Sequence, residues 1–337
     1  MYGLRLRTDL ERSVIDGFAL PLGLVPSALA APIQGYTIEY LQGEEDEPDT
    51  YAFYIVVSHE RVGTLMDQLL LLLPREVYGI VEIGSRDAYR TTDVYMAQDA
   101  FPRDEFLRGW RRYRHFILED GSIAAGANSE EPYVEVFLDH WKGITVTVPL
   151  LMRDQVEHLL TEEGLEEVIE TWPITDDGDA EFLEIRPVLT FEDGSLPDED
   201  ELLRELRHIW RLELNVDPDS NLDEGGRELG STLWHATLMV ESMRDAEVVA
   251  TVSVWATASS ISEMEELIED SLERYPAWRV LELDTIDRVA FDERPPSLEE
   301  LEPRRLVTEV HLVEFEPAVH SPETVEGGGS PEGHEYG

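Results

Sequence analysis

The 337-residue chain contains no cysteine, and this absence excludes several kinds of chemistry at once. Without a thiol there are no disulfides, no cysteine nucleophile and no thiolate metal ligands. Lysine is almost absent as well, because Lys142 is the only one in the chain. The phosphate-binding loop GxxxxGK[ST] is therefore excluded, since Lys142 is followed by Gly143 and not by Ser or Thr.

The sequence also lacks an apolar run of the eighteen or so residues that a membrane-spanning helix requires. The segment 18–33, FALPLGLVPSALAAPI, is the best candidate for a targeting signal, but it contains two internal prolines and follows three acidic residues. A secretory signal instead has a basic start and an uninterrupted apolar centre. We therefore expect a cytoplasmic protein that does not bind a membrane.

Acidic residues dominate what is present. There are 73 Asp and Glu against 26 Lys and Arg, which gives a formal net charge of −47. Such a charge repels itself in dilute buffer, whereas molar salt shortens the Debye length to about 3 Å and screens the repulsion. Because the acids occur in nearly every stretch, we interpret them as an adaptation to a concentrated-salt cytoplasm, as in halophiles. The alternative is an acidic inhibitor or nucleic-acid mimic, which should concentrate its acids in one region.

Length and a hydrophobic content of 42% predict two folded lobes and a short tail. We place the first lobe at 1–172 and the second at 173–318. The boundary lies in TWPITDDGDA, a polar segment that contains a proline and a glycine. The remaining residues, 319–337, are rich in Gly, Pro and Glu and lack apolar periodicity, which predicts disorder.

The pattern of strands and helices predicts an α+β fold with mainly antiparallel sheets and with helices packed on one face. Residues 51–57, YAFYIVV, have the composition of a buried strand, and Ser58 is placed to cap a helix over 59–73. Further strand and helix signals follow as far as residue 138. Their order is β-α-β-β-α-β, which predicts a ferredoxin-like topology for the first lobe.

A similar succession appears in the second lobe. Two strand patterns, 233–241 and 248–256, are separated by a short polar segment and predict a hairpin. Ser260 and Glu263 have the spacing of a capping box, so we expect a helix over 261–275, which Pro276 ends. The following strand pattern at 280–286 predicts that this helix packs against an antiparallel sheet.

The most unusual local feature is the segment 106–116, FLRGWRRYRHF. On a helix, the basic side chains at i, i+3, i+4 and i+7 share one face, and guanidinium groups donate paired hydrogen bonds to carboxylates and phosphates. The alternative is that the protein's own abundant acids neutralise this face. Nucleic acid is an unfavourable partner, because the net charge repels a polyanion. The residues that we predict to bind an anion are Arg108, Arg111, Arg112 and His115.

A second candidate site has the oxygen side chains Asp217, Asp219, Asn221 and Glu228 at relative positions 1, 3, 5 and 12, as in an EF-hand calcium loop. However, Leu222 stands where that loop needs glycine, and a strand pattern replaces the second helix. A solvated acidic loop is the alternative interpretation. Ca²⁺ is the one cofactor that the sequence suggests, since the nine histidines form neither HxH nor HExxH.

No catalytic motif accompanies these features, because GxSxG and a strand-following GxGxxG are both absent. We therefore predict a non-catalytic binding or regulatory module that binds a protein partner or a second copy of itself through a sheet edge or a helix. The main alternative is an enzyme that acts on a small phosphate- or carboxylate-bearing substrate at the arginine face.

Overall fold

The chain divides into two compact units. The computed structural model describes residues 3–26, 31–43, 48–172, 183–191, 194–197, 201–302 and 307–317. Unit 1 comprises Met1–Ser85 and Thr91–Val216, and unit 2 comprises Arg86–Arg90 and Asp217–Gly337. The tail expected at 319–337 lies outside the described residues, as does most of the expected boundary segment.

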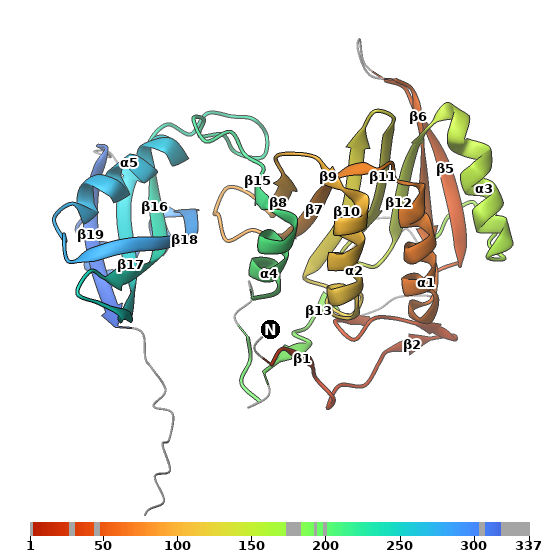
Figure 1. Ribbon diagram of the computed structural model, residues 1–337, viewed down its shortest axis with the longest axis horizontal. Coiled ribbons are helices and arrows are strands. Elements are labelled where there is room, and N and C mark those ends of the chain that lie inside the picture. Colours follow the sequence, from red (N-terminus) through yellow and green to blue (C-terminus); the bar gives the residue numbers. More distant parts are fainter. Residues whose placement is uncertain are drawn as a thin grey trace, which may run out of the picture. The chain divides into compact units, whose positions relative to one another are not determined.

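Unit 1 is built on a nine-stranded sheet in which all neighbouring strands are antiparallel (Figure 1). Eight strands form the path β15-β8-β7-β10-β11-β12-β6-β5, and β9 pairs with β7 beside that path. Their bounds are β5 Gly35–Leu41, β6 Thr50–Val56, β7 Glu76–Gly84, β8 Thr92–Ala97, β9 Phe101–Pro102, β10 Ile123–Glu130, β11 Tyr133–Leu138, β12 Ile144–Pro149 and β15 Leu212–Leu214.

Three helices lie on one face of this sheet (Figure 1): α1 (His59–Leu69), α2 (Arg103–Ile117) and α4 (Glu201–Trp210). A fourth, α3 (Arg153–Glu162), follows β12. Ser58 occupies the N-cap position of α1, as predicted, but its side chain makes no capping hydrogen bond. Its hydroxyl instead donates to Glu60 and accepts from the backbone N–H of Ala19, which ties the N-terminal segment to the start of α1.

The packing of α2 against α4 explains why unit 1 extends beyond residue 172. Trp210 is fully buried, and its ring stacks on Phe106 with the ring centroids 4.6 Å apart. Gly109 makes this approach possible, because a Cβ there would lie 2.4 Å from Nε1 of Trp210. After α4, β15 pairs with β8. The two units therefore divide at Val216, and the expected division at 172/173 falls within unit 1.

The α+β class is confirmed, but the ferredoxin-like topology is not. A split βαβ unit places one strand between the two strands that its helix joins. Three strands, β10, β11 and β12, lie between β6 and β7, which α1 joins. The element order along the chain was compatible with both arrangements, because strand pairing between distant segments decides the topology.

Short strand pairs complete unit 1 around its N-terminal segment. In the order of pairing they are β1 (Arg5–Leu6) with β14 (Leu189–Thr190), β2 (Val14–Ile15) with β3 (Phe18–Ala19), and β4 (Leu24–Pro26) with β13 (Leu183–Ile185). Unit 1 thus uses segments from both ends of its sequence to enclose its core.

Unit 2 contains a four-stranded antiparallel sheet in the order β18-β16-β17-β19. The strands are β16 (Thr232–Ser242), β17 (Asp245–Ala258), β18 (Trp278–Val289) and β19 (Glu309–Pro317), and the helix is α5 (Ile261–Leu272). The predicted hairpin and the predicted helix are confirmed. The Ser260 hydroxyl caps α5 by accepting the N–H of Glu263, 3.1 Å away.

A buried ion pair holds Arg86–Arg90 within unit 2. The Asp87 side chain is 0% exposed and that of Arg288 is 2% exposed, and Nε of Arg288 donates to Oδ2 of Asp87 over 2.7 Å. The N–H of Ala88 donates to the Arg288 carbonyl over 2.9 Å. Because a buried charge is stable only with a partner, this segment is part of the fold of unit 2.

Within the described ranges, none of the helices is long and apolar enough to cross a membrane.

Candidate functional site

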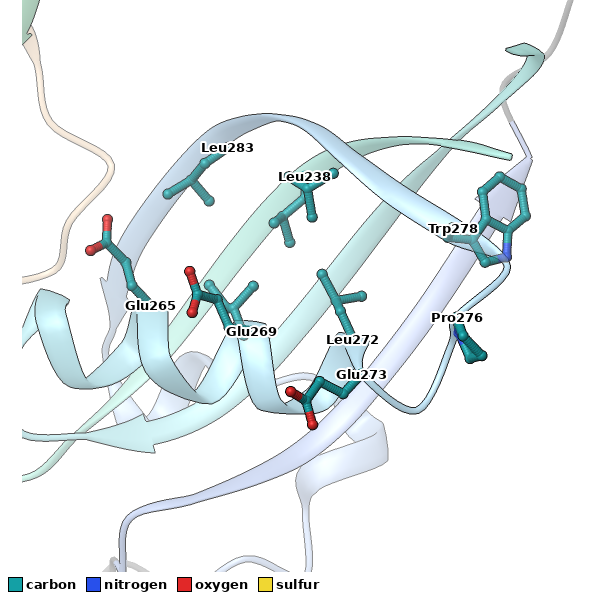
Figure 2. A pocket seen from close by; sticks show the side chains of 10 residues that line it. Leu238, Glu265, Glu269, Leu272, Glu273, Pro276, Trp278 and Leu283 are labelled. Atoms are coloured by element: carbon teal, nitrogen blue, oxygen red, sulfur yellow. The ribbon is translucent and has the colours of Figure 1, made fainter. Parts of the chain in front are cut away.

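A groove of about 760 Å³ lies beside α5 in unit 2 (Figure 2). Figure 2 shows the side chains of Leu238, Leu272 and Leu283 pointing into the space between α5 and β18, with Trp278 at one end. The apolar lining comes from two strands, one helix and the turn after that helix, and consists of Leu238, Ile268, Leu272, Pro276, Trp278, Val280 and Leu283.

The groove exists because α5 covers only part of the sheet. The helix buries Ile261, Met264 and Ile268 and packs on β17 and β19. The same face of the sheet continues across β16 and β18, where Leu238 forms the floor of the groove. On this face the β16 side chains are buried, with Leu238 only 2% exposed, so the part that stays open is the edge strand β18.

Strand β18 exposes apolar side chains along this groove. Val280, which lines it, is 44% exposed, and Leu283 and Trp278, which also line it, are partly exposed. At the end of the groove the Trp278 ring contacts Phe315 with the centroids 5.7 Å apart, and Phe315 in turn contacts Tyr275. Contiguous exposed apolar surface bordered by polar groups is typical of an interaction site.

One wall of the groove carries a row of three carboxylates. Glu265, Glu269 and Glu273 follow one another at four-residue spacing and are all exposed. Across the described part of the chain, none of the three forms an ion pair. Glu273 is also the C-cap of α5, where the helix dipole adds negative potential. The wall is therefore suited to basic groups, whereas the floor is suited to apolar ones.

The predicted anion site lies in unit 1, on α2. Arg108, Arg111, Arg112 and His115 are all exposed on the helix, as its periodicity requires. Among the described residues, Arg108, Arg111 and Arg112 form no ion pair with the protein's own acids. The Arg112 guanidinium lies over the Tyr113 ring. Burial, with a smaller effect of the neighbouring Arg114, lowers the pKa of His115. The face is thus cationic through its arginines.

The predicted calcium ligands lie in unit 2 and are used in other ways. Asn221 is buried, and its Oδ1 accepts a hydrogen bond from Arg288 while its Nδ2 donates to the Gly230 carbonyl and the Thr232 hydroxyl. An oxygen bonded to a guanidinium is a poor ligand for a cation. In the described ranges no group of three His, Asp or Glu side chains is arranged to hold a metal ion. The hydrogen bonds of Asn221 therefore argue against its acting as a calcium ligand.

The loop residues Asp217 and Asp219 shape a turn between β15 and β16 that contacts the start of α5. Oδ1 of Asp217 accepts the N–H of Asp219, and Oδ1 of Asp219 accepts the hydroxyl of Ser262. Glu228 forms a backbone bridge with Leu222. The spacing that resembled a calcium loop corresponds to a turn that fastens the chain to the first turn of the helix.

Two groups in unit 1 escaped sequence reasoning, and the first is Glu119. Its carboxylate accepts two hydrogen bonds from Arg12, at 2.6 and 3.0 Å, one from Nε2 of His59 and one from the N–H of Leu22. Burial by itself would raise the pKa of Glu119, but these hydrogen bonds outweigh it and lower the pKa to about 2. Glu119 thus joins the N-terminal segment to α1 and to the end of α2.

The second is Lys142, the sole lysine. It has a positive φ of 64°, and its Nζ donates to the carbonyls of Ile123 and Asp139. Burial lowers its pKa to about 8, against the opposing effect of nearby acids. The adjoining cavity, which His59 and Trp141 also line, has a volume of about 10 Å³. That is room for about one water molecule, so this cluster holds the fold together and does not receive an organic ligand.

Part of this was visible in the sequence and part was not. Lys142 could have been noticed in the sequence, because it is the only lysine in a chain whose other basic residues are arginine and histidine. Nothing distinguished Glu119 or the three groove glutamates from the other acids. Comparison with protein-family models, with curated proteins and with solved structures gives no match.

Proposed function

We propose that this protein is a non-catalytic binding module and that the groove beside α5 binds a segment of a partner protein that carries both apolar and basic side chains. The observation that supports this is the combination of an apolar floor with one row of carboxylates, none of which has an ion-pair partner among the described residues. Uncharged apolar grooves accept many segments, whereas a single acidic wall selects those with basic groups on one side.

We further propose that this binding takes place in a salt-rich cytoplasm, which the −47 net charge favours. At molar salt the Debye length is about 3 Å, so long-range steering is lost and only charges in direct contact still attract. The apolar floor then contributes most of the affinity, and the carboxylates contribute specificity at contact distance.

The test is a selection from a random peptide library against the folded protein at high salt. Enriched peptides should contain apolar residues together with Arg or Lys. Glu269→Arg should lower the affinity of these peptides by about tenfold or more, because an opposite-charge contact becomes a like-charge one. Glu266→Arg is the matched control, since Glu266 is exposed on the same helix but does not line the groove.

Two results would contradict this function. One is enrichment of acidic or purely polar peptides, which the carboxylate wall should repel. The other is that Glu269→Arg and Glu266→Arg lower the affinity for the selected peptides to the same extent, which would place the binding site outside the groove.

A second candidate function is binding, or enzymatic conversion, of a small anion at the α2 arginines. It is supported by the three exposed guanidinium groups that make no ion pair within the described residues. Charge reversal at Arg111 and Arg112 should abolish the heat of titration with pyrophosphate or citrate. Equal heats for the variant and the unchanged protein would remove these residues from the site.

A further inference from the structure

We infer that unit 2 contains a proton-operated switch on β19, in which protonation of His311 releases this edge strand from the sheet. The inference is independent of what the groove binds. Three features of unit 2 support it: the position of β19 in the sheet, the hydrogen bond between His311 and β17, and the scarcity of charged groups that could stabilise a protonated ring.

Strand β19 has backbone pairing on one side only. It lies at the end of the order β18-β16-β17-β19 and pairs with β17 alone. The register shifts between Trp255 and Ala256, which stand opposite Leu312 and Val310, so His311 falls at the irregularity. A bulge of this kind interrupts the backbone hydrogen bonds of the ladder. Segments with few such contacts are the parts of a protein that open locally at the lowest cost.

The His311 side chain joins the two strands at this interruption. Its Nε2 lies 2.6 Å from the hydroxyl oxygen of Thr257 on β17. The His311 side chain is only 8% exposed and Thr257 is fully buried, so the pair is largely shielded from water. A side-chain hydrogen bond therefore holds β19 where its backbone pairing is irregular.

A positive charge on the His311 ring has little to stabilise it in the sheet. Burial lowers the pKa of His311, against the smaller effect of Glu309, whose carboxylate lies 3.8 Å from Nδ1 but is 61% exposed. Strand β17 has no titratable side chain from 248 to 258. On α5, which also packs against β19, Glu263 accepts a hydrogen bond from Thr308. Protonation therefore favours the released strand, in which water hydrates the imidazolium.

The direction of the pH dependence follows from the lowered pKa. In the released strand His311 has its ordinary pKa of 6.5, whereas in the sheet its pKa is lower. The closed form therefore loses stability as the pH falls below 6.5, by at most about tenfold in the opening equilibrium per pH unit. Protonation of surface carboxylates acts in the opposite direction, because it relieves their mutual repulsion.

A second histidine makes unfolding of the whole unit steeper than release of β19. Nε2 of His235, on β16, lies 2.7 Å from the Ser253 hydroxyl, and the ring stacks on Trp255 with the centroids 4.2 Å apart. Burial lowers the pKa of His235 too, although Asp287 of β18 stands opposite it in the register. Because β16 is paired on both sides, His235 becomes fully hydrated only when the sheet unfolds. The unfolding equilibrium of unit 2 should therefore change by up to about a hundredfold per pH unit.

The test is hydrogen exchange of the full chain at constant molar salt, from about pH 7 to about pH 5. Protection factors correct for the intrinsic effect of pH on exchange. Those of the β19 amides should fall by up to about tenfold per pH unit below 6.5, and those of β16 should fall more steeply. Titration of the ring followed by NMR should give His311 a pKa below 6.5 in the folded protein.

Three substitutions separate the switch from a general sensitivity to acid. His311→Gln keeps a group that can hydrogen-bond to Thr257 but cannot be protonated, so β19 should lose its pH dependence in this range. His235→Gln should leave the pH dependence of β19 in place and reduce that of β16. His158→Gln is the matched control and should change neither, because His158 lies on α3 of unit 1 with its side chain 75% exposed.

Two results of the exchange experiment overturn the inference. One is that the protection of β19 stays constant from about pH 7 to about pH 5, and the other is that His311→Gln has the same pH dependence as the unchanged protein. If His311→Gln does not fold, the NMR titration of the unchanged protein decides. A His311 pKa at or above 6.5 overturns the inference, whereas a lower pKa together with loss of β19 protection supports it.

Discussion

Unit 1 and unit 2 both pack helices on one face of an antiparallel sheet, but they complete that layer to different degrees. In unit 1, α1, α2 and α4 cover the face and bury large side chains such as Trp110 and Trp210 entirely (Figure 1). In unit 2, the single helix α5 leaves the edge strand β18 open, and Val280 on that strand is 44% exposed. The comparison shows that similar architecture can produce a closed helix layer in one unit and an open groove in the other.

The largest expected effect is that of salt. Self-repulsion of the carboxylates should cause loss of helicity and cooperativity below about 0.5 M salt. Unit 2 should open first, because its edge strand β18 is largely exposed. Circular dichroism follows the whole protein, and hydrogen exchange resolves the two units. A spectrum unchanged in dilute buffer would contradict salt adaptation and favour the acidic-mimic interpretation.

A matched pair of substitutions compares the covered face with the open one. Trp210→Ala should lower the free energy of unfolding of unit 1 by about 3–5 kcal/mol, because it leaves a cavity between α2 and α4. Val280→Ala should cost unit 2 less than about 1 kcal/mol, because that side chain remains partly in water. Denaturant titration measures both, and equal costs would mean that the groove is closed in solution.

The buried ion pair tests whether unit 2 depends on the segment that interrupts unit 1. Asp87→Ala should cost about 3–5 kcal/mol, because it leaves the Arg288 guanidinium buried without a counter-charge. Arg279→Ala, which breaks the exposed pair with Glu241, is the control and should cost less than about 1 kcal/mol. If the two variants unfold at the same denaturant concentration, the segment 86–90 is dispensable.

The pH dependence due to Glu119 is expected to be a smaller effect than that of Trp210→Ala or Asp87→Ala. Its folded pKa, about 2, lies below the ordinary value of 4.5, so its contribution is complete above about pH 5 and is lost as the pH falls towards 2. With a side chain only 11% exposed, the contribution to unit 1 is roughly 3 kcal/mol. Glu119→Gln should therefore be less stable than the unchanged protein at pH 6 and similar at pH 2. A difference that persists at pH 2 would assign the effect to packing.

Local sequence signals predicted local structure well. The strand at 51–57, the helix at 59–73 and the helix capped by Ser260 all occur close to their expected bounds, because periodicity and capping depend on neighbours in the chain. The shared face of Arg108, Arg111 and Arg112 was predictable for the same reason. The hydrogen bonds of Asn221 could not be predicted in this way, because the calcium spacing measures distance along the chain and not where a side chain points.

The amino-acid sequence by itself determined the class of the protein, its elements, its extreme charge and the kinds of chemistry that it excludes. These follow from composition and from interactions over a few residues. Only the tertiary structure decided that three strands separate β6 from β7, that residues 86–90 belong to unit 2, and that a groove opens between α5 and β18. Those outcomes depend on pairing and packing between distant segments, which no local pattern of residues records.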